Sequence, residues 1–118
     1  MGSVAIKEEQ REFVTVDWGK TKNIFGTENV GAKYVRINIT EYAPGTAHKL
    51  HRHPDQEEVI YILEGEGITR TDAGDQRIGP GSFVFVPAGT DHATLNVQKD
   101  KPMRAVIIKS PPVEGKRK

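Results

Sequence analysis

The chain has 118 residues, 28% of them charged and 36% apolar, and its 17 Lys and Arg residues nearly balance 16 Asp and Glu residues. This length supports one domain core. The scattered, balanced charge excludes the basic stripe that is typical of nucleic-acid-binding proteins. Because the chain contains no cysteine, it can form neither a disulfide nor a thiolate metal site, and any metal would need His and carboxylate ligands.

Residues 1–11 lack the apolar stretch of a signal peptide, and no apolar run approaches the roughly 18 residues that a membrane span requires. We therefore expect a cytoplasmic protein. We also expect an N-terminal arm at 1–11, a single domain at 12–109, and a flexible basic tail at 110–118, where two Pro, one Gly and three terminal basic residues disfavour regular structure.

Short segments of strand-forming residues alternate with turns rich in Gly and Pro along the rest of the chain, which predicts an all-β antiparallel sandwich or barrel. Residues 57–64 could fit a buried helix, but the β-branched and aromatic run at 59–62 favours a central strand covered on both faces. Residues 34–40 alternate polar and apolar side chains, which predicts a strand with one apolar face. The predicted strands are 12–18, 33–42, 48–53, 57–63, 67–71, 82–86, 92–97 and 103–109.

Three of the four histidines lie within six residues of one another. On a strand, His51 and His53 point to the same face about 7 Å apart along the chain, so the two imidazoles can converge on one ion. Reversal of the chain at 54–57 would place Glu58 on the neighbouring strand, opposite this pair. The alternative is an exposed polar strand start followed by a charged turn.

Two spaced patterns in the chain resemble the two sequence motifs of the cupin family. The first consists of Gly45, His51, His53, Glu58 and Gly65, and the second of Gly81, Pro87, Gly89, His92 and Asn96. This resemblance implies a double-stranded β-helix, or jelly-roll barrel, of the cupin type. It also implies one metal ion inside the barrel, held by His51, His53, Glu58 and His92. We assign the glycines to turns and Asn96 to a satisfied interior polar group.

Three imidazoles and one carboxylate suit a divalent transition metal (Mn, Fe, Co, Ni, Zn or Cu) better than Ca or Mg. A six-coordinate ion would keep two open positions for a substrate, water or dioxygen. Two functions follow. The first is a small-molecule enzyme: a dioxygenase, lyase or isomerase of a small organic acid, phenolic or sugar derivative. The alternative is a non-catalytic cupin that binds or senses a small ligand.

Two cupin activities fit the sequence poorly. Oxalate decarboxylases carry an Arg where this chain has Ile68. Sugar-phosphate isomerases need a basic phosphate-binding set, for which the chain offers only Arg36, Lys49 and Arg70.

The alternation of side chains along a strand suggests which of them surround the metal. Ile60 and Ile62 would point to the same face of their strand as Glu58 and would form an apolar cavity wall. Proton transfer could come from a metal-bound water, from Lys49 or from Tyr34. His48 would point to the opposite face of the strand from His51, so we expect it on the outer surface and not as a fifth metal ligand. Further candidates for the pocket are Arg36 and Asn38, if their strand turns its polar face inward, and Phe83 and Phe85, unless Val84 and Val86 are the inner pair.

Edge strands of a small barrel must be paired or covered. We therefore expect a homodimer that pairs through the terminal strands 12–18 and 103–109.

Overall fold

The computed structural model describes residues 2–113, which form ten strands, a 3-10 turn (η1, Glu8–Gln10) and one short helix (α1, Thr27–Val30). The strands are β1 (Val14–Val16), β2 (Gly19–Phe25), β3 (Arg36–Tyr42), β4 (Ala47–His51), β5 (Glu57–Glu64), β6 (Gly67–Thr71), β7 (Gly74–Ile78), β8 (Phe83–Val86), β9 (His92–Asn96) and β10 (Met103–Ser110).

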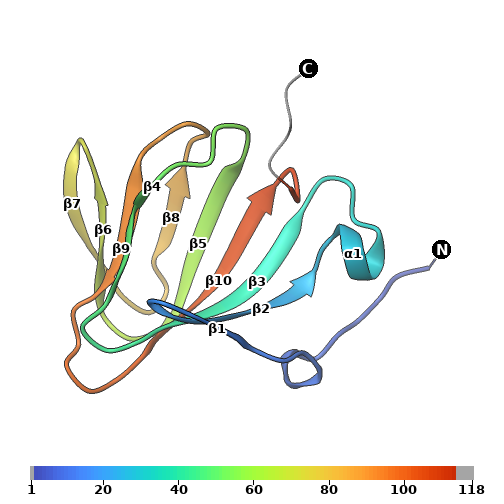
Figure 1. Ribbon diagram of the computed structural model, residues 1–118, viewed down its shortest axis with the longest axis horizontal. Coiled ribbons are helices and arrows are strands. Elements are labelled where there is room, and N and C mark those ends of the chain that lie inside the picture. Colours follow the sequence, from blue (N-terminus) through green and yellow to red (C-terminus); the bar gives the residue numbers. More distant parts are fainter. Residues whose placement is uncertain (1, 114–118) are drawn as a thin grey trace.

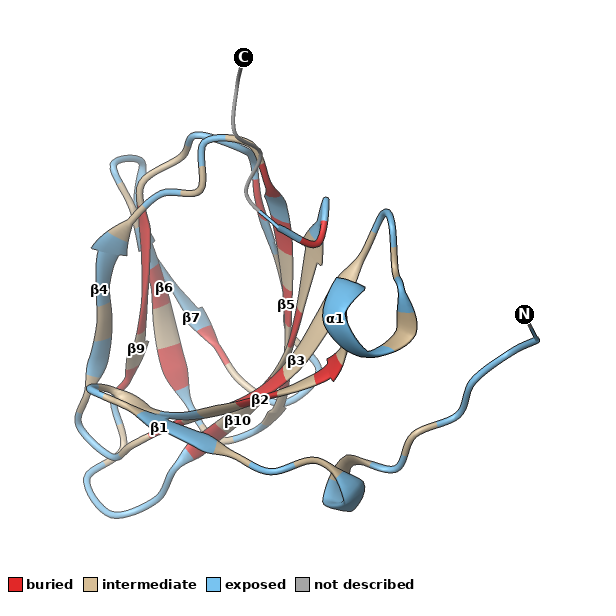
Figure 2. Ribbon diagram, turned by 45° about the vertical axis from the view of Figure 1, so that its right-hand side comes forward, coloured by how far each residue is buried: buried red, intermediate tan, exposed pale blue. Residues whose placement is uncertain are grey.

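The strands form two antiparallel sheets that face each other as a jelly-roll barrel (Figure 1). The larger sheet has the order β1-β2-β3-β10-β5-β8, and the smaller one has the order β4-β9-β6-β7. In Figure 2, β4, β9 and β6 of the smaller sheet stand opposite β5 and β3 of the larger one. The predicted all-β barrel is therefore confirmed.

The hydrophobic core lies on the inner face of the larger sheet. Along β5 every second residue is buried and the others are more exposed, so this central strand is covered fully on its inner face and only partly on the other. Ile60 and Ile62 have no exposed surface, and they cluster with Met103 and Ala105 of β10. Deep burial of aliphatic side chains at the centre of the sheet stabilises the barrel.

Several predictions about the strands need correction. β2 and β7 are absent from the predicted strands, because their sequences contain few apolar residues and β7 is an exposed sheet edge. The strand expected at 12–18 extends only over β1, and a turn follows it. β10 was expected as a contact edge, but β3 and β5 pair with both of its sides.

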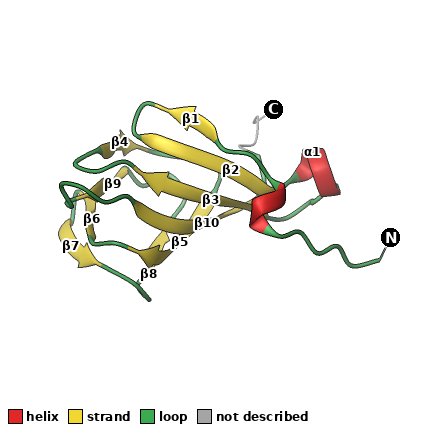
Figure 3. Ribbon diagram, turned by 90° about the horizontal axis from the view of Figure 1, so that it is seen from below, coloured by secondary structure: helices red, strands yellow, loops and turns green. Residues whose placement is uncertain are grey.

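The outer face of β2, β3 and β10 is covered by the N-terminal segment. The Glu8 carboxylate lies 3.2 Å from the ammonium of Lys22 and 2.6 Å from the guanidinium of Arg104. Figure 3 shows η1 against the ends of these strands. The ion pairs matter because Lys22 is only 5% exposed, and a buried ammonium is costly without an anionic partner.

The start of the predicted tail packs against the barrel. Ser110 ends β10, Pro112 is buried, and the Gln56 amide donates a hydrogen bond to the Pro111 carbonyl. Residues 114–118, the rest of the predicted tail, lie outside the described residues.

Candidate metal centre

Three histidines and one glutamate meet inside the barrel from both sheets. His51 ends β4, and its register partner His92 begins β9. His53 lies in the loop after β4, so the prediction that it shares a strand with His51 over 48–53 is wrong. Glu58 comes from β5, which belongs to the opposite sheet, so the expectation of a neighbouring strand is wrong. The carboxylate reaches the histidines across the interior of the barrel.

The ligand atoms of His51, His53 and His92 all lie within 4.8 Å of one another. The Glu58 carboxylate lies 3.4 Å from His53 Nε2 through Oε1 and 3.6 Å from His92 Nε2 through Oε2. The three imidazoles therefore converge on one point in the interior, and the Glu58 carboxylate lies beside two of them.

Burial indicates that a cation belongs at this point. Glu58 is 5% exposed and His92 is 1% exposed, yet Glu58 Oε1 and His92 Nε2 have no hydrogen-bond partner among the described residues. Buried polar atoms in folded proteins are nearly always hydrogen-bonded. Imidazole nitrogens and a carboxylate are typical ligands of divalent transition metals, so these residues fit a metal ion.

Backbone carbonyls orient two of the imidazole rings. His51 Nδ1 lies 2.6 Å from the Lys49 carbonyl oxygen, and His92 Nδ1 lies 3.3 Å from that of Thr90. Because a carbonyl can only accept, each Nδ1 carries the proton, and each Nε2 keeps a lone pair for the interior. This arrangement of a metal-binding histidine is common in metalloproteins.

Electrostatics favour an ionised Glu58 and a neutral His51. Burial opposes ionisation of Glu58, but the neighbouring His92 and the positive charge of Lys109 outweigh it and lower its pKa. Burial lowers the pKa of His51. Both directions favour the protonation states that bind a metal.

His48 lies in the interior and not on the outer surface, which corrects the prediction. His48 pairs with Thr94 and His51 pairs with His92, so three steps along β4 oppose two steps along β9. This β-bulge puts both histidines on one face. The His48 ring stacks between Trp18, at 4.2 Å, and His51, at 3.9 Å. Burial, followed by repulsion from His51, lowers the pKa of His48 to about 3.

A small cavity of about 100 Å³ adjoins Glu58, and we call it the inner chamber. It is lined by Trp18, Thr21, Asn38, Thr40, Tyr42, His48, Glu58, Ile107 and Lys109. Asn38 of the predicted pocket set therefore lies here. Sequence reasoning missed Trp18 and Lys109. For Lys109 a signal existed, because it continues the parity of the buried residues Met103, Ala105 and Ile107 along β10.

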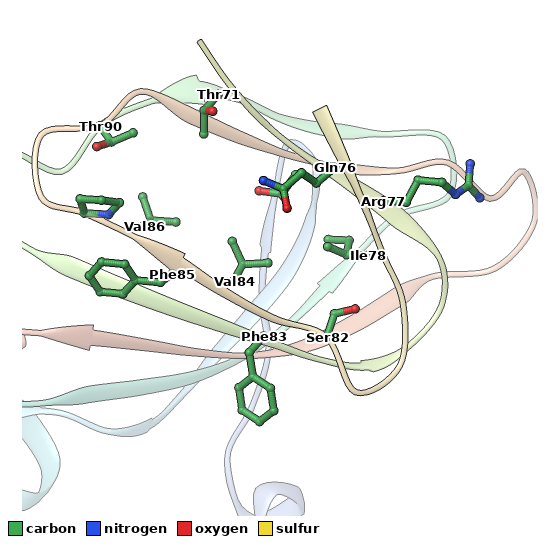
Figure 4. Close-up of a pocket in the computed structure, with 12 residues that line it drawn as sticks. Thr71, Gln76, Arg77, Ile78, Ser82, Phe83, Val84, Phe85, Val86 and Thr90 are labelled. Atoms are coloured by element: carbon green, nitrogen blue, oxygen red, sulfur yellow. The ribbon is translucent and has the colours of Figure 1, made fainter. Parts of the chain in front are cut away.

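Other predicted pocket residues lie away from the site. Ile60 and Ile62 pack in the core and line neither the inner chamber nor the pocket of Figure 4. Arg36 forms an ion pair with Glu28, at 2.9 Å. Tyr34 is 78% exposed. Lys49 is also exposed, and its backbone carbonyl, not its ammonium, contacts His51.

Phe83 and Phe85 lie on the outer face, where they are 73% and 59% exposed. The register opposes Val84 to Ile60 and Val86 to Glu58, so these two valines are the inner pair. In Figure 4 the Phe83 ring points away from Gln76, Ile78 and Val84. The pocket drawn in Figure 4 has a volume of about 300 Å³ and lies between β8 and the strands β6 and β7.

An exposed ion pair joins the two segments that carry the histidines. Arg52 donates two hydrogen bonds to Asp91, at 2.7 and 3.0 Å. Arg52 lies between His51 and His53, and Asp91 precedes His92. The pair therefore restrains the distance between the two loops.

A family model of the cupin domain matches residues 38–109. The chain therefore belongs to the cupin family, in agreement with its fold and with the positions of its motifs.

Known cupins of several activities are similar to this chain. It is 36% identical over 66 residues to the oxalate-binding protein of Thermotoga maritima, covering 55% of this chain and 54% of that protein. It is 38% identical over 85 residues to the dimethylsulfoniopropionate lyase DddQ of Ruegeria pomeroyi, covering 71% and 38%. The fold matches the polyketide cyclase RemF of Streptomyces resistomycificus with a TM-score of 0.80, at 21% identity and coverages of 99% and 87%.

The chain spans about half the length of the curated relatives it matches. Among the described residues, none of the helices has the length and apolar character to cross a membrane.

The buried histidines should make the metal-free protein sensitive to acid. Because burial holds the pKa of His48 near 3 in the folded state, against 6.5 ordinarily, the unfolded chain binds more protons between these values. The free energy of unfolding should therefore be highest above pH 6.5 and should fall as the pH drops towards 4. His48→Phe, which keeps the stacking, should reduce this slope in denaturant titrations. Equal slopes in both proteins would contradict the assignment.

The pair between Arg52 and Asp91 should support metal binding weakly. We expect Arg52→Met to weaken Zn²⁺ binding by only about two- to fivefold, since an exposed ion pair is screened by solvent and contributes little. Competition with a chromophoric chelator measures this affinity. Arg70→Met is the matched control, because Arg70 forms the same two-bond pair with Asp75 on the β6–β7 hairpin. A similar loss in both variants would show that the position of the pair is unimportant.

Proposed function

We propose that this cupin is a metal-dependent enzyme of a small molecule, with one divalent transition-metal ion held by His51, His53, His92 and Glu58. The observation that carries the proposal is the buried Glu58 carboxylate, which faces three imidazoles and has one oxygen without a hydrogen bond. Such a set needs a cation to offset the cost of burying the carboxylate. The donor atoms suit Mn, Fe, Co, Ni, Zn or Cu.

The residues around this site have different roles in binding and orienting the groups that react. A bound metal would supply Lewis-acid polarisation of a substrate oxygen or activation of dioxygen. Glu58 offsets part of the positive charge, and the Lys49 and Thr90 carbonyls hold two rings in the required tautomer. The inner chamber beside Glu58 provides space for a substrate, which a purely structural metal site would not need.

A second candidate function is non-catalytic binding of a small ligand. The 36% identity to an oxalate-binding protein favours it, whereas the similarity to a lyase favours catalysis. Both functions use the same site, so turnover distinguishes them.

We also propose a cytoplasmic homodimer. The strands β1 and β8 are the two edges of the larger sheet, and Phe83 and Phe85 of β8 are exposed. Pairing with a second copy would cover these groups. Sedimentation equilibrium should give twice the mass of the chain, and a monomer at high concentration would exclude the dimer.

Metal content tests the ligand set. We expect about one equivalent of metal in protein purified without a chelator or a His tag. Glu58→Gln and His92→Ala should each lose most of it, since the remaining groups form an incomplete site. Glu57→Gln is the matched control, because Glu57 is the exposed neighbour of Glu58 on β5. Full occupancy in both His51→Ala and His92→Ala would contradict the site.

Turnover tests the catalytic role. Protein loaded separately with Mn²⁺, Fe²⁺, Ni²⁺, Cu²⁺ or Zn²⁺ should convert at least one compound in a panel of small acids, phenolics and sugar acids, with or without dioxygen. Activity should disappear in Glu58→Gln and persist in Glu57→Gln. Saturable binding without product under every metal would favour the non-catalytic alternative.

A further inference from the structure

The inner chamber contains one positively charged group that the proposed metal site does not use. Lys109 lies opposite Glu58 in the register of β10 and β5, and both residues line the chamber. The half-buried ammonium nevertheless forms no ion pair with Glu58. Among the residues that the structure describes, no hydrogen bond or ion pair involves the Lys109 side chain.

This absence is unusual, because an ammonium next to a buried carboxylate on the same sheet face normally pairs with it. Here Lys109 is near enough to lower the pKa of Glu58 but forms no ion pair with it. Both side chains line the chamber, so an anionic ligand oxygen inside it could reach the ammonium.

The acidic and the basic group that line the chamber are the Glu58 carboxylate and the Lys109 ammonium. Tyr42 from β3 stays a neutral phenol, since burial raises its pKa. The charges of Glu58 and Lys109 offset each other, and a divalent ion at the proposed site would give the interior a net positive charge. Such a site attracts anions.

One wall of the chamber offers hydroxyl and amide groups. The hydroxyls of Thr21 and Thr40 lie 2.9 Å apart, and the Asn38 amide donates to the Thr21 hydroxyl at 3.3 Å. These residues come from the neighbouring strands β2 and β3. They can hydrogen-bond the polar atoms of a ligand while Trp18 and Ile107 contact its carbon atoms.

The volume limits the ligand. A water molecule occupies about 30 Å³ in the liquid, and a cavity of about 150 Å³ holds benzene. The inner chamber of about 100 Å³ therefore fits an acid with roughly two to four carbon atoms, by the same comparison. A substituted aromatic acid is too large for it.

We propose that the inner chamber binds a small aliphatic carboxylate and that Lys109 is the residue that selects its negative charge. The inference rests on the proposed function, because it names the substrate class of the same site. It adds a specificity residue on β10 that does not belong to the ligand set.

Binding of defined acids tests this inference without any turnover. Trp18 is the only tryptophan of the chain and lines the chamber, so its fluorescence reports on occupancy. The probes are pyruvate and malonate, with acetamide as a neutral compound and 3,4-dihydroxybenzoate as a large acid. Calorimetry gives the affinities in parallel, for the Zn²⁺-loaded and the metal-free protein.

We expect pyruvate or malonate to bind more tightly than either comparison compound. Lys109→Met should weaken this binding by at least about tenfold, the usual effect of losing a charge-assisted hydrogen bond. Lys109→Arg should retain most of it. Lys99→Met, which removes an exposed lysine outside the site, should bind as the wild type does. Zn²⁺ content should stay the same in all variants.

Three results would overturn the inference. The first is unchanged acid binding in Lys109→Met, and the second is loss of Zn²⁺ in that variant, which would mean that Lys109 acts only through Glu58. The third is that neither small acid binds to the wild type, with or without Zn²⁺. Failure of the proposed function gives a different pattern, since wild type would then bind no metal while the metal-free protein still reports on Lys109.

Discussion

The arrangement of the interior depends on one buried carboxylate. Glu58 is almost fully enclosed, its pKa is lowered, and two imidazoles lie within 3.6 Å of its carboxylate. An ionised group in this position costs several kcal/mol unless a cation compensates it. Because Glu58 belongs to the larger sheet and the histidines to the smaller sheet and its loops, the cation that satisfies them would also tie the two halves of the barrel together.

The bulge in β4 gives the site a second layer. A regular strand would turn His48 away from His51, since alternate side chains point to opposite faces. With one additional residue in β4, His48 instead stacks on His51 and reaches Trp18. This aromatic stack supports the His51 ring from behind and forms a wall of the inner chamber. The same local irregularity therefore positions a candidate ligand and shapes the adjoining cavity.

The fold and the candidate ligands could be predicted from the sequence because their signals are local. Turn glycines such as Gly89, which adopts a positive φ of 76°, fix the number of residues between the end of one strand and the candidate ligand that follows, here His92. Asn96 could be interpreted in the same way, and it is hydrogen-bonded to three carbonyl groups as expected. The side chains that face the interior were harder to predict, because the face to which a strand residue points depends on register and on bulges. His48 was misplaced for this reason, and the sequence left open whether Phe83 and Phe85 or Val84 and Val86 are the inner pair of β8.

The polar face of β3 shows why composition alone misidentifies the interior of this barrel. Alternation along β3 predicts one apolar face, with Ile37 and Ile39, and one polar face, with Asn38 and Thr40. In the structure the isoleucines lie on the sheet face that the N-terminal segment covers, and the polar pair lines the chamber. Burying polar side chains is costly unless they are hydrogen-bonded, and Thr21 provides partners for both. A barrel built only for stability would place apolar residues there, so the polar wall beside Glu58 and Lys109 is best explained by a polar ligand.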